Sequence, residues 1–319
     1  MFMPKLEGID YKEMYGLSVD KENKDIFFND SQHLYVNKRD GSHYISVTQL
    51  IGEYENKFDE DFWSKYKALE LFLDGDVWSN VKAKLQSTKK WDNTLLEKYN
   101  INIEDFNIEV DKIKQEWAQT RDEACEHGSY VHSLMENTLY GNTQFDLGKY
   151  GYSEASGLYE CPRNYYELDL DNAIYPEFLM SWISEDGALK LAGQSDLIVK
   201  RGNNIWCLDW KTNKEIKKRS YYDKNRKDVQ RMKYPLNNFM DCNYAHYQLQ
   251  LSTYCWMLQQ IRPEFEIKGI SIIHIDRNGK QTEYPMEYCK NDVERMIRHY
   301  KNQLQIKSQL DRLEPYKIG

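Results

Sequence analysis

Two acidic residues, Asp196 and Asp209, lie on what the sequence predicts to be neighbouring strands. Each adjoins an apolar run, Leu197–Val199 and Ile205–Leu208, and the Gly202-Asn203 pair between the runs is typical of a β-hairpin turn. With the turn centred there, opposed residue numbers sum to 405, so the two carboxylates face each other. Like charges directly opposed destabilise a strand pair, so this arrangement calls for a positive partner.

A third acid, Glu177, extends this row. The run Ile174–Ile183 is predicted to be a strand, and Asp186-Gly187 is a strong signal for a two-residue turn. Opposed residue numbers across that turn sum to 373, which places Glu177 opposite Asp196. Lys211 lies two residues beyond the last acid, on the same face of its strand. Carboxylate oxygens suit Mg²⁺ or Mn²⁺, so a divalent cation is the expected partner of the row.

A helix predicted from about Ile113 to Tyr140 carries further polar residues on one face. Cys125, Gly128, His132 and Glu136 recur on one stripe of this helix. Glu136 shares a face with His132 and is expected to orient the second nitrogen of its ring. Gly128 is expected to allow the close approach of another element.

Composition narrows the class of protein. The chain has 319 residues and a net charge of −8, and no stretch approaches the roughly 20 apolar residues of a membrane span. The start, Met1–Lys5, lacks an apolar signal-peptide core, so we expect a cytoplasmic protein. The six cysteines form no C-x-x-C pair, which argues against zinc and iron–sulfur sites and favours reduced thiols.

One stretch of the chain is basic, although the chain as a whole is acidic. Between Lys211 and Lys233 there are ten Lys/Arg and three Asp/Glu, a net charge of +7, which leaves −15 for the rest of the chain. Such a strip favours contact with a polyanion, and its tyrosines suit stacking on the bases of a single strand. The low apolar content of Lys214–Asn243 predicts a mobile loop. The candidate contact residues are Lys214, Tyr221, Tyr222 and Tyr234.

Together these residues resemble the PD-(D/E)xK nucleases, and within them the RecB-type branch. The resemblance implies an α/β fold of mixed α+β type, a restriction-endonuclease-like core whose central mixed β-sheet is flanked by helices, with an N-terminal β and helical elaboration. The matching residues are Gly193-x-x-Asp196, Asp209-Trp210-Lys211-Thr212, the helical His132 with the segment 121–132, Gln250-x-x-x-Tyr254, and the early segment 46–51.

The expected organisation is a single nuclease domain over residues 1–319. Its expected parts are an N-terminal β region at 1–50, a helical subdomain at 51–120, the PD-(D/E)xK core at 121–290 and a C-terminal helix at 291–319. Thr48 is the predicted N-cap of the first helix. Later in the core we expect a helix over 244–260 and strands over 270–275 and 282–286.

The resemblance also implies roles for individual residues, around one or two divalent ions. Direct metal ligands are implied at His132, Asp196 and Asp209. The Trp210 carbonyl adds a ligand, and Glu177 joins a second ion or its waters. Lys211 would orient or help deprotonate the attacking water, while Gln250 and Tyr254 would hold the phosphate or brace Lys211.

The implied activity is hydrolysis of DNA by a Mg²⁺- or Mn²⁺-dependent deoxyribonuclease. We expect an exonuclease that acts on DNA ends or single strands in replication, recombination or repair. The resemblance to RecB-type exonucleases of about this length is also compatible with a phage or mobile-element origin, and a phage-encoded protein would act in the host cytoplasm. An endonuclease or junction resolvase of the same fold and a nucleic-acid-binding protein without activity are the alternatives, and RNA stays open as a substrate. The chain has no G-x-x-x-x-G-K-[ST] helicase motif, so it works alone or recruits a replication or recombination protein.

Overall fold

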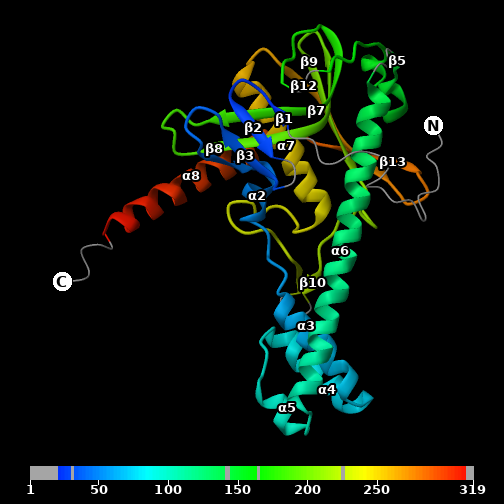
Figure 1. Ribbon diagram of the computed structural model, residues 1–319, viewed down its shortest axis with the longest axis vertical. Helices are drawn as coiled ribbons and strands as arrows, with labels where there is room; N and C mark the ends of the chain where they lie inside the picture. Colours follow the sequence, from blue (N-terminus) through cyan, green and yellow to red (C-terminus); the bar gives the residue numbers. More distant parts are fainter. Residues whose placement is uncertain (1–20, 30–31, 141–143, 164–165, 224–226, 314–319) are drawn as a thin grey trace. The chain divides into compact units, whose positions relative to one another are not determined.

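The computed structural model describes residues 21–29, 32–140, 144–163, 166–223 and 227–313 (Figure 1). They divide into two compact units, each described by itself below. The larger takes its residues from 1–55, 128–222 and 229–319, and the smaller from 56–127 and 223–228. None of the described helices is both long and apolar enough to cross a membrane.

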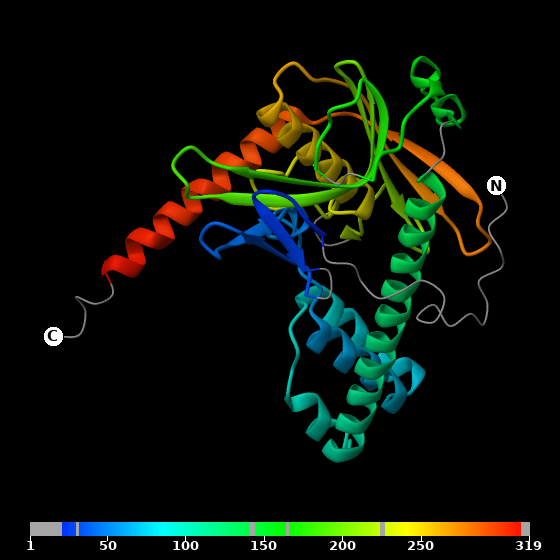
Figure 2. The same cartoon turned by 45° about the horizontal axis from the view of Figure 1, so that its top comes forward.

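A mixed sheet organises the larger unit. Its described strands are β1 (Lys21–Glu22), β2 (Ile26–Asn29), β3 (Leu34–Asn37), β4 (His43–Ser46), β7 (Asn172–Ile183), β8 (Lys190–Arg201), β9 (Asn204–Lys211), β12 (Glu266–Ile275) and β13 (Gln281–Met286). They follow the order β1-β2-β3-β4-β8-β9-β12-β13, and β7 also pairs with β8. The β4–β8 and β9–β12 pairs are parallel and the others antiparallel. Figure 2 shows the N-terminal strands beside the β7–β8 hairpin, so the predicted N-terminal β region belongs to the central sheet.

Both predicted hairpin registers are confirmed. Opposed residues of β7 and β8 sum to 373, as in the pair Tyr175 and Ile198. Those of β8 and β9 sum to 405, as in the pair Leu197 and Leu208. The turns carry glycines with positive φ, as such turns require. Because the side-chain period of a strand is two residues, these registers place the predicted acids on one face.

Helices cover both faces of the sheet. The helices of this unit are α2 (Val47–Gly52), α7 (Asn243–Ile261), α8 (Lys290–Leu313) and the last part of α6 (Ile103–Leu139). Apolar residues of α2, α7 and α8 share one buried cluster with the sheet, and those of α6 share another. On β8, Ile198 belongs to the first cluster and Leu197 and Val199 to the second, as side-chain alternation requires. The predicted mixed α/β core is confirmed.

Short elements connect α6 to β7. They are β5 (Gln144–Phe145), η1 (Leu147–Tyr150), η2 (Ser153–Ala155) and β6 (Gly157–Leu158). Several apolar side chains of this segment are buried against the α6 face of the sheet, among them Phe145, Leu147 and, just after β6, Tyr159. This segment therefore extends the core on that face.

The smaller unit is a helical bundle with a core of its own. It comprises α3 (Glu60–Phe72), α4 (Gly75–Thr88), α5 (Thr94–Lys98) and residues 103–127 of α6. Phe62, Leu69 and Phe106 are among its buried core residues. α6 begins well before the predicted Ile113 because the side chain of Asn102 accepts hydrogen bonds from the first turn, at 2.8 and 3.2 Å.

The predicted cap of α2 was wrong. Ser46, and not Thr48, caps this helix: its hydroxyl accepts the N–H of Gln49 at 3.0 Å, and Oε1 of Gln49 accepts the N–H of Ser46 at 2.9 Å. This reciprocal pair is a capping box, which Thr48 cannot make two residues later.

The segment 214–243, predicted to be a mobile loop, contains a little regular structure among its described residues. It contains the paired strands β10 (Tyr222–Asp223) and β11 (Asp228–Val229). Ile216, Met232 and Leu236 are buried in the main core. A few well-spaced apolar residues therefore fix a segment that is otherwise charged.

Candidate active site

The row of acids lies where β8 and β9 separate. β7 pairs with β8 along one edge, except at the opposed positions Glu177 and Asp196. On the other edge, β9 pairs with residues 197–201 and β4 with residues 191 and 192. Residues 193–196 lie between these two pairings and include Gly193 and Asp196. The strand edge that carries the central acid is thereby left open to side chains from the helices.

Gly193 leaves room for α7 at this edge. A Cβ on Gly193 would lie 2.5 Å from Cε1 of Tyr254 and 3.2 Å from Cγ2 of Val47. Both neighbours are buried side chains with little space to move. The Gly193-x-x-Asp196 spacing thus combines a carboxylate with the one residue type that lets α7 pack against the same strand.

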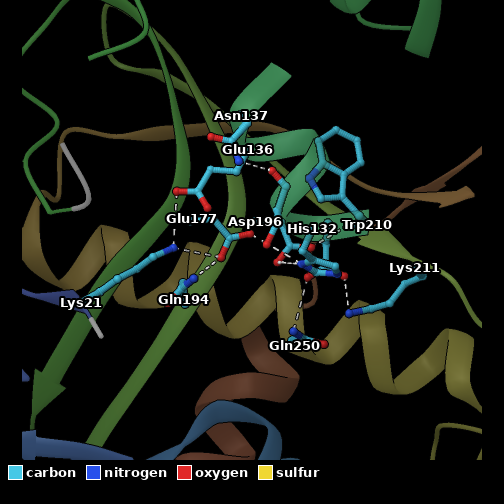
Figure 3. Close-up of polar contacts among 12 residues, drawn as sticks. Lys21, His132, Glu136, Asn137, Glu177, Gln194, Asp196, Trp210, Lys211 and Gln250 are labelled. Atoms are coloured by element: carbon cyan, nitrogen blue, oxygen red, sulfur yellow. Dashed lines mark hydrogen bonds and ion pairs between the residues drawn. The ribbon is translucent and has the colours of Figure 1, made fainter. Parts of the chain in front are cut away.

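Three side chains from three elements converge beside this edge (Figure 3). Nδ1 of His132, on α6, lies 3.6 Å from Oε1 of Glu177 on β7 and 3.5 Å from Oδ1 of Asp196 on β8. One nitrogen or oxygen atom from each residue lies within 4.8 Å of the other two. Oε1 of Glu177 is buried and receives no hydrogen bond from the described part of the chain. These atoms fit a divalent ion that accepts imidazole and carboxylate ligands.

Charges within the trio interact strongly. Burial acts to lower the pKa of His132, but the carboxylates of Asp196 and Glu177 outweigh burial and raise it to about 9. Burial, together with the nearby charge of Asp209, holds the pKa of Asp196 well above its usual range. Strong pKa shifts of this kind are typical of sites where neighbouring charged groups interact.

An unusual backbone conformation positions Glu177. Its φ is +52°, in the left-handed region that residues with a side chain seldom occupy, although the ladder to β8 continues on both sides. Oε2 of Glu177 accepts a hydrogen bond from Nε2 of Gln194 and lies 3.5 Å from Nζ of Lys21. The two oxygens of this carboxylate therefore face different partners.

A second group of side chains surrounds Lys211. Its Nζ lies 2.5 Å from Oδ2 of Asp209 and 4.7 Å from the ring centre of Tyr247. Oδ1 of Asp209 accepts a hydrogen bond from Nε2 of Gln250 at 3.4 Å, and Gln250 also donates to the hydroxyl of Tyr254 at 3.1 Å. Burial acts to lower the pKa of Lys211, but the carboxylate of Asp209 outweighs it and raises the pKa. Gln250 of α7 therefore positions the carboxylate of Asp209, and this carboxylate positions Lys211.

Trp210 connects the two groups. Its backbone N–H donates to Oδ2 of Asp196 at 2.7 Å, across the gap between β9 and β8. Its side chain is buried in the core on the α6 face of the sheet. Because Oδ2 of Asp196 is occupied in this way, Oδ1 is the oxygen that faces His132.

Part of the chain is similar to a known protein family. Residues 162–316 match the model of the PD-(D/E)XK nuclease superfamily. They form a PD-(D/E)XK nuclease superfamily domain. A solved structure titled "Crystal structure of SSO0001" shares 16% sequence identity, with a TM-score of 0.30, over 62% of this chain and 70% of that one. No curated protein matches the chain.

The nuclease domain gathers most of the predicted site residues. β7, β8 and β9 carry Glu177, Asp196, Asp209, Trp210 and Lys211, and α7 carries Gln250 and Tyr254. His132 lies on α6, outside the matched residues. The expected close approach at Gly128 is to Thr212, whose Oγ1 would lie 3.5 Å from an added Cβ. That is an ordinary contact, so this position does not require glycine.

The prediction for Glu136 was wrong. Its Oε1 lies 3.5 Å from Nζ of Lys21 and accepts a hydrogen bond from Tyr140 at 3.3 Å, whereas His132 is not among its described contacts. A shared helix face brought the two residues near each other, but the lysine charge attracts the carboxylate.

Sequence reasoning missed two residues of the cluster, Lys21 and Gln194. Gln194 precedes Asp196 by two residues and so shares its strand face, a signal that was available. Lys21 lies in a two-residue strand far away in the sequence, and no pattern points to it.

The predicted contact residues of the basic strip lie outside this cluster. Lys214 is exposed, as are Tyr221 and Tyr222, at 59% and 52% of their surface. Lys218 makes cation–π contacts with two more tyrosines. Its Nζ lies 5.3 Å from the ring centre of Tyr244 and 5.2 Å from that of Tyr284. The strip therefore presents cations and aromatic rings together on the surface.

Proposed function

We propose that this protein is a metal-dependent deoxyribonuclease of the RecB-type branch, and that it acts as an exonuclease on DNA ends or single strands. The observation that carries the proposal is the convergence of His132, Glu177 and Asp196 beside the Asp209–Lys211 pair. One group suits a divalent ion and the other suits a phosphate and its attacking water. The order of His132, the acids and the Gln250–Tyr254 pair along the chain supports the RecB-type assignment.

In this proposal His132, Glu177 and Asp196 hold Mg²⁺ or Mn²⁺. When bound, the ion lowers the pKa of a water molecule and neutralises charge on the phosphate. The buried Oε1 of Glu177, which lacks a hydrogen bond among the described residues, supports the assignment because a buried carboxylate oxygen needs a positive partner. The ligand roles of Asp209 and of the Trp210 carbonyl stay predictions from the sequence.

Lys211 would bind the phosphate and orient the attacking water. Its ammonium group is held by Asp209, which is held in turn by Gln250. Such a chain fixes a long, flexible side chain in one position before the substrate binds, and preorganised charge of this kind stabilises a transition state effectively. Gln250 and Tyr254 are positioning residues in this scheme.

The substrate would approach over the basic strip. Lys214, Tyr221 and Tyr222 are exposed and combine positive charge with rings that can stack on bases. Stacking requires unpaired bases, which favours a single strand or a frayed end over an intact duplex. A single-strand preference agrees better with an exonuclease than with an enzyme that cuts within duplexes.

The test is cleavage of end-labelled linear DNA and closed circular DNA, single- and double-stranded, with Mg²⁺ or Mn²⁺. We expect the wild-type protein to degrade linear DNA only, and Asp209→Ala and Lys211→Ala to abolish cleavage. Lys268→Ala is a matched control, since it breaks an exposed 2.7 Å pair with Glu266 in the same unit and leaves the site intact. Unchanged degradation by either site variant would refute the proposal, and cutting of circles would make the enzyme an endonuclease.

A further inference from the structure

A lysine lies at each end of the row of acids (Figure 3). Lys211 lies beside Asp209 at one end, as described above. At the other end Nζ of Lys21 lies 3.5 Å from both Glu177 and Glu136. Lys21 is only 8% exposed, so its charge is placed within the site and not in solvent. Burial of a lysine costs desolvation free energy, which is offset here only if its charge stabilises the two neighbouring carboxylates.

In each of the proposed carboxylate ligands, Asp196 and Glu177, one oxygen faces His132 and the other contacts surrounding groups. Asp196 turns Oδ1 towards His132, while Oδ2 accepts the N–H of Trp210. Glu177 turns Oε1 towards His132, while Oε2 is taken by Gln194 and Lys21. Each acid therefore offers one oxygen to a cation at the centre of the trio.

A carboxylate that gives one oxygen to each ion can bridge two metal ions about 4 Å apart. Glu177 is the residue placed for that role, and its outer oxygen is already occupied by a donor and a cation. A second divalent ion on that side would also lie close to the ammonium group of Lys21, whose charge repels it.

We propose that Lys21 takes the place of a second divalent ion, so that the site binds one ion. The inference rests on the proposed function, because it assumes that the trio binds metal. Lys21 acts as a positioning residue: it neutralises the outer oxygen of Glu177 and the carboxylate of Glu136, and it leaves the inner oxygen to the single ion.

The test is the number of Mn²⁺ ions bound per chain, measured by isothermal titration calorimetry and, for ion pairs, by the Mn–Mn coupling in electron paramagnetic resonance spectra. We expect one ion and no coupling in the wild-type protein. Lys21→Met frees the outer oxygen and should bind a second, weaker ion that couples to the first. Lys21→Arg keeps the charge and should bind one.

Two further variants keep the test decisive. Lys21→Gln retains a hydrogen-bond donor for the two acids and replaces Lys21→Met if that variant does not fold. Lys38→Met removes an exposed lysine that pairs with Glu22 at 2.7 Å, and it should bind one ion like the wild-type protein.

The possible results separate the two proposals. Two ions in the wild-type protein, or one ion with unchanged affinity in both neutral Lys21 variants, would overturn the role of Lys21 and leave the nuclease proposal standing. A wild-type protein that binds no Mn²⁺ would overturn both.

Discussion

Replacement of Gly193 by alanine tests how the strand that carries Asp196 packs against α7. The new methyl group would lie 2.5 Å from a ring carbon of Tyr254, which is 3% exposed and cannot turn into solvent. Overpacking of this kind costs about 1–3 kcal/mol. Since about 1 kcal/mol corresponds to roughly 2–4 °C in domains of about 200 residues, the melting temperature should fall by about 2–12 °C.

Activity should fall further than stability. Tyr254 accepts a hydrogen bond from Gln250, and Gln250 donates to Asp209, so a displaced ring disturbs the carboxylate that holds Lys211. A misplacement of about 1 Å at such a site lowers the rate on the order of 10²-fold. Thermal melting and the rate of DNA cleavage would be measured on the same preparation.

A matched control comes from the same unit. A Cβ added to Gly52, at the end of α2, would meet no atom within 4 Å, so Gly52→Ala should leave melting and cleavage unchanged or slightly raise stability. If the clash with the ring is the cause, adding Tyr254→Leu to Gly193→Ala should restore stability but not activity. A Gly193→Ala protein that melts like the wild type and cleaves DNA at the same rate would show that the close approach of α7 has no functional importance.

Three other substitutions test separate parts of the structure. Asp196→Asn should weaken Mn²⁺ binding by at least about 10-fold in calorimetry while the thermal melt persists, and an unchanged affinity would remove Asp196 from the ligands. Ser46→Ala should lower the free energy of unfolding in urea by about 1 kcal/mol, whereas Thr48→Ala should change it by less than about 0.5 kcal/mol; equal effects would contradict the capping box. Tyr221→Ser with Tyr222→Ser should weaken binding of a single-stranded oligonucleotide, measured by fluorescence anisotropy, by about 1–3 kcal/mol for each lost stack. Equal affinity would exclude these two rings from the substrate path.

The β7–β8 and β8–β9 registers were predictable because short-range signals fix them. Two turn glycines with positive φ, flanked by apolar runs, determine which residues of β7, β8 and β9 oppose one another. That count brings Glu177 and Asp196 to neighbouring positions, but it does not predict the left-handed backbone that positions the Glu177 side chain. The ends of helix α7 were predicted to within one residue of the structure.

Other features depend on contacts that no local pattern records. Lys21 reaches the site through the pairing of β1 with β2 at the far end of the sheet order. Glu136 pairs with that lysine and not with His132, although helix spacing favours either partner. The predicted cap of α2 was two residues too late because Ser46 and Thr48 are both good cap residues, and only the Gln49 side chain decides between them.

The left-handed backbone of Glu177 is retained at a cost that its side-chain contacts outweigh. Such a conformation costs a residue with a side chain on the order of 1–3 kcal/mol, and glycine would avoid that cost. Glycine would also remove the buried carboxylate that contacts Lys21 and Gln194, and removing one partner of a buried charged pair costs about 3–5 kcal/mol. The strained glutamate is therefore the more stable choice at position 177, and screens for heat-resistant variants of this chain should retain it even when activity is not selected.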